Sequence, residues 1–246
     1  MRTAGKLIEI SRRLSRAVEG LSFGPPVSRV YNPLRYARAV HEAYLARYGA
    51  APRRVVFLGM NPGPWGMAQT GVPFGEVQAV RDWLGLRAPV SRPAREHPRR
   101  PVLGFDCPRS EVSGRRLWGL IRARFGTPEE FFAEHFVANY CPLLFLDAGG
   151  ANLTPDRLRA AERDSLLAIC DAHLAELLDF LRPEWGIGVG RFAEACLRRV
   201  IESLPARVSA GLRVGGIPHP SPANPSANRD WAGRAERTLV ELGVWR

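Results

Sequence analysis

Lysine is almost absent from this chain. Lys6 is the single lysine, and the other 34 of the 35 basic residues are arginines. The glycine-rich loop at residues 57–76 therefore lacks the lysine with which a P-loop holds nucleotide phosphates. This absence argues against a nucleotide-phosphate-binding enzyme.

The sequence also lacks the common motifs of metal, redox and hydrolase sites. The four cysteines form no CxxC pair, which excludes a zinc ribbon or a thioredoxin-like site and predicts buried free thiols. There is no GxSxG or HExxH motif, and the glycines at 186–190 do not have GxGxxG spacing. We therefore expect no metal ion and no cofactor.

Long apolar runs are missing too. No stretch of about 18 apolar residues occurs, and the charged N-terminus lacks the apolar core of a secretory signal. We expect a protein that is neither secreted nor membrane-bound, located in the cytoplasm or nucleoid of a bacterium or in the nucleus of a eukaryote. The net charge of +11 (35 − 24) favours an anionic partner, and nucleic acid is the commonest one.

Predicted strands alternate with predicted helices over most of the chain. This order favours one α/β domain with a mainly parallel sheet and helices on both faces. The proline- and arginine-rich stretch 87–110 is the one candidate for disorder. Thr154 and Pro155 predict the cap and first turn of a long helix. The predicted strands are 55–58, 136–139, 185–189 and 212–217, and the predicted helices are 4–21, 34–48, 76–84, 112–125, 128–134, 154–181, 191–204 and 228–242.

Three polar residues follow predicted strands at their carboxyl ends, namely Asn61, Asn139 and His219. Taken singly, each is an ordinary turn or core residue. In a parallel sheet these ends share one crevice, where open α/β sheets bind ligands. The amides can donate and accept, and the imidazole can donate to a developing oxyanion. The set suits attack by water on a substrate whose leaving group becomes anionic.

Phe74 lies in the same loop as Asn61, between Pro73 and Gly75. Its ring offers a stacking face for a planar ligand, or an anchor that holds the loop in the core. The sequence favours neither interpretation over the other.

Several motifs resemble those of the single-strand-selective monofunctional uracil-DNA glycosylases. The resemblance covers roughly residues 50–246 and implies a three-layer α/β/α sandwich on a four-stranded parallel sheet, with residues 1–50 as a helical segment packed on it. The matching stretches are GMNPGP at 59–64, GMAQTGVPFGEV at 66–77, VRDWLG at 80–85, RPVLG at 100–104, SEVSG at 110–114, CPLLFL at 141–146 and HPSP at 219–222.

The resemblance also implies an activity, which is hydrolysis of the N-glycosidic bond of uracil and of 5-hydroxymethyluracil or other modified uracils in single- and double-stranded DNA. Asn61 would position the water near C1′ of the sugar. His219 would donate toward uracil O2, helped by the backbone N–H of Met60. Because an amide cannot act as a carboxylate base, catalysis would depend on stabilising the leaving base.

The same resemblance assigns the base-binding residues. Asn139 would bind the Watson–Crick edge of uracil, and Phe74 would stack on the flipped base. Gly63 lies where strict uracil enzymes carry a bulky side chain, so glycine predicts room for a 5-substituent.

The DNA-binding segment is expected after His219, where the family inserts a wedge into the base stack. Ser221, Pro222, Ala223, Asn224 and Arg229 are its candidate residues. Relatives carry arginine at the position of Ala223, and a methyl group cannot fill the vacated stack. We therefore expect weak action on well-paired duplexes, where flipping costs a few kcal/mol, and a preference for single strands or U·G pairs.

The single lysine predicts a monofunctional enzyme, because backbone cleavage by a glycosylase usually proceeds through an amine that forms a Schiff base. Two other functions stay open at this point. One is a relative specialised for hypoxanthine or xanthine, and the other is a catalytically silent module that binds DNA lesions. We expect a monomer.

Overall fold

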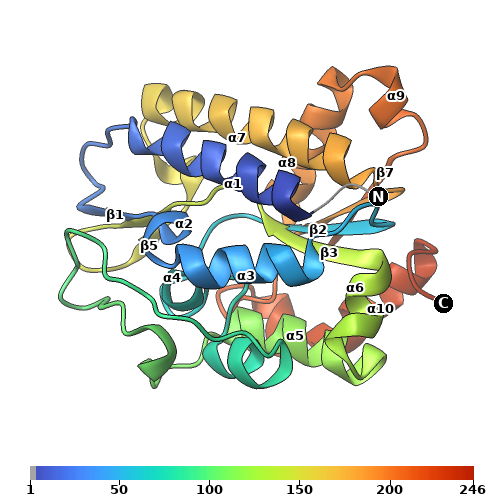
Figure 1. The fold of residues 1–246 in the computed structure, drawn as a ribbon, viewed down its shortest axis with the longest axis horizontal. Helices are drawn as coiled ribbons and strands as arrows, with labels where there is room; N and C mark the ends of the chain where they lie inside the picture. Colours follow the sequence, from blue (N-terminus) through green and yellow to red (C-terminus); the bar gives the residue numbers. More distant parts are fainter. Residues whose placement is uncertain (1–3) are drawn as a thin grey trace.

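The computed structural model describes residues 4–246, apart from the side chains of Pro225 and Ser226. Its centre is a parallel sheet of four strands in the order β3-β2-β6-β7 (Figure 1). Gly59 at the end of β2 pairs with Asn139 at the end of β3, and Val189 of β6 pairs with Ile217 of β7. The predicted parallel sheet is confirmed. The strands are β2 Val55–Gly59, β3 His135–Asn139, β6 Trp185–Val189 and β7 Arg213–Ile217.

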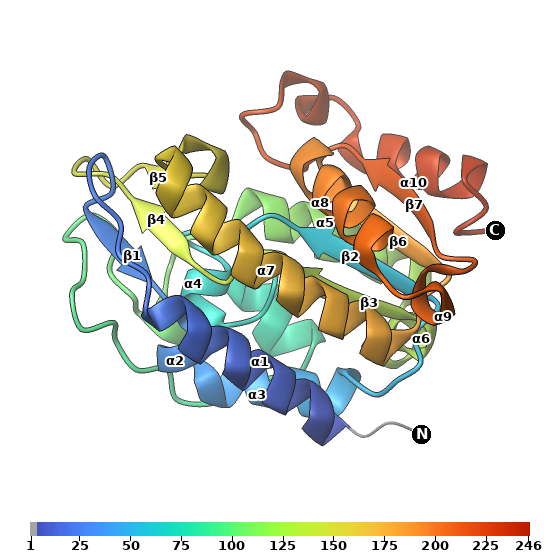
Figure 2. The same ribbon diagram turned by 90° about the horizontal axis from the view of Figure 1, so that it is seen from above.

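Helices cover both faces of this sheet, which gives three layers. On one face lie α1 (Ala4–Glu19), α7 (Ala160–Leu181) and α8 (Arg191–Ser203), as Figure 2 shows from above. The other face carries α5 (Val112–Phe125), α6 (Pro128–Glu134) and α10 (Trp231–Glu241) (Figure 1). Because both faces are covered, β2 is a continuous run of buried apolar residues and does not alternate.

One predicted helix is two in the structure. The stretch 34–48 divides at Ala37 into α2 (Pro33–Tyr36) and α3 (Arg38–Tyr48). The hydroxyl of Tyr44 on α3 donates to the carbonyl of Val137 at 2.8 Å. Since β3 is an edge strand, α3 covers the edge that would otherwise expose unpaired backbone groups.

A second, smaller sheet was not predicted. It contains β1 (Arg29–Tyr31), β4 (Leu144–Leu146) and β5 (Asn152–Leu153), all antiparallel. Strands this short carry too little periodicity to be recognised in a sequence. This sheet extends the molecule beyond the carboxyl end of β3, on the left of Figure 1.

The prediction of disorder for 87–110 is wrong. The backbone N–H of His97 donates to the Tyr31 hydroxyl at 2.6 Å, and Tyr31 in turn donates to the Arg100 carbonyl at 2.8 Å. Buried Gln69 accepts from Leu103 N–H at 2.8 Å and donates to the Pro101 carbonyl at 3.0 Å. Partners distant in the sequence therefore order a segment whose composition alone suggests coil.

Thr154 does not cap the long helix as predicted. Pro155 begins a single 3₁₀ turn, Pro155–Arg157, and α7 starts later, at Ala160. By contrast, Thr127 does cap α6, because its hydroxyl accepts from Glu130 N–H at 3.3 Å. The remaining short helical elements are α4 Met67–Thr70, a π-helical turn Ala79–Trp83, 3₁₀ turns Gly104–Asp106 and Pro225–Asn228, and α9 Ala206–Ser209.

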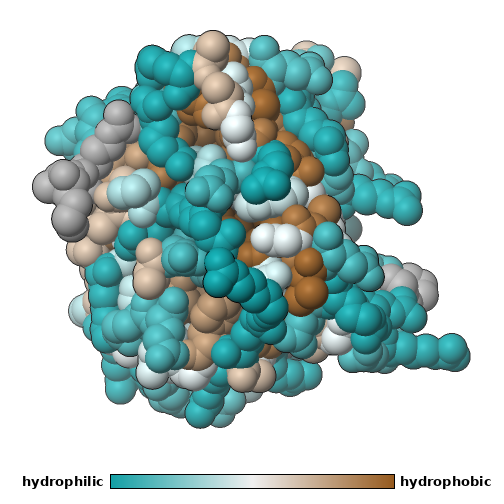
Figure 3. Space-filling view, turned by 90° about the vertical axis from the view of Figure 1, so that its right-hand side faces the viewer, coloured by the Kyte–Doolittle hydropathy of each residue, from teal (hydrophilic) through white to brown (hydrophobic). Residues whose placement is uncertain are grey.

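Figure 3 shows the side of the molecule that lies on the right in Figure 1. Hydrophilic side chains cover most of it, with apolar ones visible between them. Because α6 leads into β3 and α9 leads toward β7, this is the side where the strands begin. Between residues 4 and 246 we find no helix with the length and apolarity needed to span a bilayer.

Candidate active site

A cleft of about 540 Å³ opens at the carboxyl ends of the central strands. Asn61 follows β2, Asn139 ends β3 and His219 follows β7, and all three line this one cleft, as the sequence predicted. The full lining is Met60, Asn61, Gly63, Pro64, Trp65, Phe74, Ser110, Glu111, Val112, Ser113, Asn139, Asn152, Thr154, His219, Ser221, Pro222 and Ala223.

The amide of Asn61 has a defined orientation. Its Nδ2 donates to the carbonyl of Leu143 at 3.2 Å. Because the nitrogen is engaged there, Oδ1 is the atom left to accept a hydrogen bond inside the cleft. An acceptor in this position can hold a water molecule and orient its lone pair. Met60 precedes it and is fixed through its carbonyl, which accepts from Cys141 N–H at 2.8 Å.

His219 has a defined tautomer. The backbone N–H of Ser221 donates to its Nδ1 at 3.1 Å, so the proton of the neutral ring resides on Nε2. Burial lowers the pKa of His219 below its ordinary value of 6.5, which favours that neutral form. The cleft therefore contains a neutral N–H donor suited to an oxyanion. Gly190, which follows β6 and has φ of +95°, leaves room for the His219 side chain, because a Cβ there would lie 3.0 Å from the Cβ of His219.

Asn139 and Phe74 meet over Gly59. A Cβ built on Gly59 would lie 2.3 Å from Asn139 Oδ1 and 2.6 Å from the Phe74 ring, so only glycine fits. Asn139 Nδ2 lies 3.2 Å from Met67 Sδ, a weak contact that leaves a second N–H for a ligand. The amide can thus present both a donor and an acceptor to a ligand in the cleft.

Phe74 combines the two interpretations that the sequence left open. Its backbone has φ of +53° and its carbonyl accepts from Trp118 Nε1 at 3.0 Å, which anchors the loop. The residue is 7% exposed and lines the cleft, and its ring lies 6.4 Å from the His219 ring, centroid to centroid. The side chain anchors the loop and faces the cleft at the same time.

Glu111 is a cleft residue that our assignment of roles missed. It immediately precedes α5 and comes from far along the chain to lie against the Asn61 loop. Burial and the nearby Glu76 carboxylate raise its pKa to about 7, against an opposing effect of the Gly114 N–H. The matching stretch at 110–114 was the available signal, but it attached no chemistry to the residue.

Glu111 also changes the interpretation of Gly63. A Cβ on Gly63 would lie 1.7 Å from Glu111 Oε1, and one on Gly66 would lie 2.1 Å from Oε2. The space beside Gly63 is therefore bounded by a carboxyl group. A large residue at 63 would have to displace Glu111, so replacing Gly63 by Tyr would not by itself test the room for a 5-substituent.

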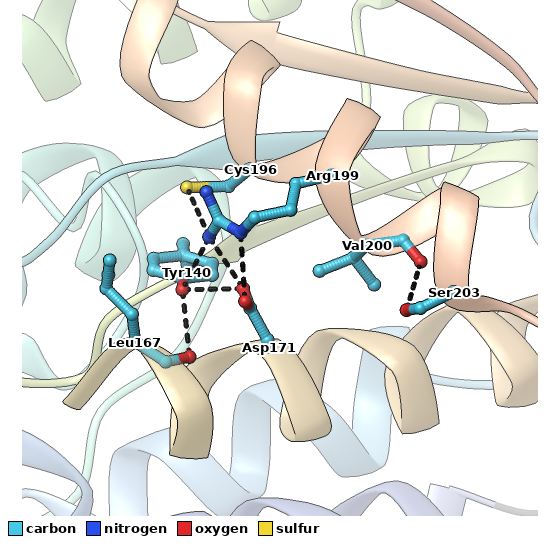
Figure 4. Close-up of polar contacts among 7 residues, drawn as sticks. All are labelled: Tyr140, Leu167, Asp171, Cys196, Arg199, Val200 and Ser203. Carbon is cyan, nitrogen blue, oxygen red and sulfur yellow. Dashed lines mark hydrogen bonds and ion pairs between the residues drawn. The ribbon is translucent and has the colours of Figure 1, made fainter. Parts of the chain in front are cut away.

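A polar network lies behind Asn139. Buried Tyr140 donates to Asp171 Oδ1 at 2.7 Å, and Arg199 donates to Tyr140 at 3.1 Å and to Asp171 Oδ1 at 2.8 Å. Figure 4 shows these side chains meeting between α7 and α8, with Cys196 beside Arg199. The network ties the residue after Asn139 to two helices and so limits the movement of the strand end.

The loop that carries the predicted DNA-binding residues is only partly at the cleft. Ser221, Pro222 and Ala223 line the mouth. The Asn224 amide turns back to donate to the His219 carbonyl at 3.2 Å, and Arg229 is exposed outside the lining. Arg116 of α5 supports the loop by donating to the Pro220 carbonyl at 2.7 Å.

Three other lining residues had no role in the site assigned to them from the sequence, namely Asn152, Thr154 and Trp65. Asn152 and Thr154 reach the cleft from β5 and the turn after it, and Trp65 lies in the loop after β2. The four cysteines are free and buried, as predicted. In the part of the chain that the structure describes, no group of His, Cys, Asp or Glu residues has the arrangement of a metal site.

Comparisons with known proteins identify the family of this chain. The profile of the uracil DNA glycosylase superfamily matches residues 46–239. The single-strand selective monofunctional uracil DNA glycosylase of Mus musculus is 50% identical over 96% of this chain and 84% of its own length. The Bos taurus protein of the same name is 51% identical over 94% of this chain and 84% of its own length.

A solved structure shares the fold at low sequence identity. The crystal structure of wild-type Pedobacter heparinus SMUG2 superimposes with a TM-score of 0.72 and 20% identity, covering 100% of both chains. At this identity the likeness concerns the fold alone. The profile match and the identity to the mammalian proteins show the family: this chain belongs to the uracil DNA glycosylase superfamily, in its single-strand selective monofunctional branch.

Proposed function

We propose that this protein hydrolyses the N-glycosidic bond of uracil in DNA and leaves an abasic site, as an enzyme of base excision repair. One observation carries the proposal: the acceptor Oδ1 of Asn61 and the donor Nε2–H of His219 face one cleft. The names of the relatives, which specify uracil, favour this activity over excision of hypoxanthine or xanthine. We extend it to 5-hydroxymethyluracil and other modified uracils.

The mechanism rests on the leaving base. A water molecule held by Asn61 Oδ1 adds its oxygen to C1′ as the C1′–N1 bond breaks, and the electron pair leaves with the base. His219 Nε2–H donates to uracil O2, where the negative charge develops. The amide of Asn61 takes no proton, so the water proton passes to the departed base or to solvent. Loss of one such donor typically lowers the rate by about 10²–10³.

The remaining lining residues bind the substrate in this proposal. The Asn139 amide pairs with the uracil edge, Phe74 stacks on the ring and Met60 N–H assists at O2. Ser221, Pro222 and Ala223 meet the strand at the cleft mouth. Because Ala223 fills little of a vacated stack, single strands and U·G pairs are the better substrates. All the residues that line the cleft belong to one chain, and we propose that the protein acts as a monomer. Its proposed location is that of its DNA substrate, which is the nucleoid of a bacterium or the nucleus of a eukaryote.

Uracil oligonucleotides in EDTA, followed by alkali to reveal abasic sites, test the proposal. We expect cleavage of single-stranded, U·G and U·A substrates in that order. Asn61→Ala should remove most of it, because no other group then orients the water. Gln78→Ala, an exposed amide outside the cleft, is the control and should keep the parental rate.

Two results would contradict the proposal. Failure to cleave any uracil substrate would favour the silent lesion-binding module. Equal rates on single-stranded, U·G and U·A substrates, with no gain on duplex from Ala223→Arg, would reject the proposed strand preference while leaving the activity intact.

A further inference from the structure

The arginines of this molecule differ in whether they are ion-paired. In the helical layers many are paired, as in Arg12–Glu42 at 2.7 Å and Arg207–Asp179 at 2.8 Å. Arg100 and Arg109, beside the cleft, have no carboxylate within ion-pair distance among residues 4–246. Their charge is therefore available to an anion from outside the protein.

Trp65 holds these two guanidinium groups. The Arg109 guanidinium carbon lies 4.7 Å from the centroid of the Trp65 ring, and that of Arg100 lies 5.2 Å from it. Stacking on an indole orients a planar guanidinium while leaving its edge N–H groups free to donate. Trp65 is itself part of the cleft lining, so the two charges lie at its rim.

The backbone beneath Arg100 is rigid. Tyr31 holds the Arg100 carbonyl and the His97 N–H, while Gln69 binds the next residues, Pro101 and Leu103. Because Gln69 belongs to α4, which follows the Trp65 loop, the ring and the arginine are anchored to one support. The arrangement thus exists before any ligand binds, which lowers the entropy cost of binding.

The donors of Arg100 are incompletely used. Its Nη1 donates to the Arg99 carbonyl at 3.0 Å, whereas its buried Nε has no partner. Because the buried Nε is not reached from solvent, the donors for a ligand are the terminal Nη groups of Arg100 and the guanidinium of exposed Arg109. Phosphate oxygens match these donors, since arginine binds phosphate through parallel N–H groups.

We propose that Trp65, Arg100 and Arg109 form a phosphate clamp that binds the backbone of single-stranded DNA at the rim of the cleft. The clamp deepens the proposed function, on which it depends for the nature of its ligand. It lies on the wall formed by the loop after β2, and the Ala223 loop contributes other residues to the same lining. A DNA single strand held by this clamp would keep a nucleotide at the cleft. It would not need a wedge residue, because a single strand has no paired base stack to fill.

Salt-dependent binding tests the clamp. The probe is a fluorescent single-stranded oligonucleotide without uracil, and anisotropy gives Kd at several salt concentrations. For single strands the slope of log K against log salt is about −0.7 per phosphate contact. The double variant Arg100→Ala/Arg109→Ala should therefore bind more weakly, and the magnitude of its salt slope should be smaller by about 1.4, which is two contacts at about 0.7 each.

The control removes the same charge elsewhere. Arg12→Ala/Arg207→Ala also lowers the net charge by two but lies on ion-paired sites away from the cleft, so its slope should match the parent. Trp65→Leu retains both charges and should weaken binding by up to about tenfold, because the guanidiniums lose their support. On a uracil oligonucleotide the arginine double variant should raise KM with little change in kcat, since it removes ground-state binding.

Equal slopes for the two double variants would overturn the clamp, and so would parental affinity in Trp65→Leu. A fall in kcat with unchanged KM would also reject it, because the arginines would then act on the chemistry. The activity is judged separately. A protein that shows the expected slopes but releases no uracil would retain the clamp and lose the proposed function.

Discussion

Burial shifts two titratable residues of the cleft toward their neutral forms. The pKa of His219 is lowered, which keeps the imidazole neutral, and that of Glu111 is raised to about 7. The Glu76 carboxylate, which is 3% exposed, adds repulsion, and the residues that the structure describes form no ion pair with Glu111. A neutral imidazole donor and a carboxyl group with a raised pKa therefore share the cleft with Asn61, which reduces the negative charge in the cleft at neutral pH.

The raised pKa of Glu111 predicts a pH-dependent stability. Between its ordinary value of 4.5 and about 7 the folded protein keeps a proton that the unfolded chain loses, so stability falls as pH rises through this range. Because Gln is neutral throughout, the free energy of unfolding of the parent should fall relative to Glu111→Gln by about 1–3 kcal/mol from pH 5 to pH 8. Urea denaturation at each pH measures it.

The matched control is Glu202→Gln, an exposed carboxylate on α8. Its stability should follow that of the parent at every pH. If the Glu111→Gln curve also ran parallel to the parent curve, the carboxyl group would have an ordinary pKa in the folded protein, and the environment described for it would be wrong.

At the scale of elements, the site depends on how closely β2 and β3 bring their loops together. Gly59 and Asn139 are paired in the sheet, and Phe74 closes over both. A side chain at 59 would push the Asn139 amide and the Phe74 ring apart. The polar network of Tyr140, Asp171 and Arg199 supports the same strand end from the α7–α8 side (Figure 4).

Gly59→Ala should therefore impair the site. The added methyl group collides with Asn139 and Phe74, so we expect a stability loss of about 1–3 kcal/mol and uracil excision at least tenfold slower. Gly119→Ala in α5 is the control, because a Cβ there meets nothing within 4 Å and a helical alanine is favoured by up to about 1 kcal/mol. Thermal unfolding and excision rates would measure both, and parental activity in Gly59→Ala would refute the close fit.

At the scale of the whole molecule, the distribution of charge separates two surfaces. The helical layers neutralise many of their arginines with carboxylates, whereas the cleft rim does not. The one lysine, Lys6, lies on α1, which packs against α3 and α7 and contributes nothing to the cleft lining. Its ammonium is 3.7 Å from Glu9. The active-site cleft thus has no lysine amine.

The reaction should accordingly stop at the abasic site. Borohydride added during excision should trap no covalent protein–DNA complex, and the strand should break only after alkali, because no Schiff base forms. A lysine-dependent lyase serves as the positive control. Trapping that disappeared in Lys6→Arg would show that α1 reaches the DNA and would contradict the monofunctional mechanism.

The sequence by itself determined the fold class and the main polar residues of the site. Alternating strand and helix patterns are local, and the residue after a strand lies at its end in any parallel sheet, so Asn61, Asn139 and His219 could be placed together in advance. The family motifs added their expected roles. The same local logic failed for 87–110, whose order comes from Tyr31 and Gln69, residues distant in the sequence.

Only the tertiary structure decided the contacts between distant segments. It brought Glu111 against Gly63, set two arginines on Trp65 and turned the Asn224 amide back toward His219. It also decided protonation, because desolvation and neighbouring charges depend on the packed surroundings of a group. These properties arise from three-dimensional proximity, which periodicity and spacing along a chain do not encode.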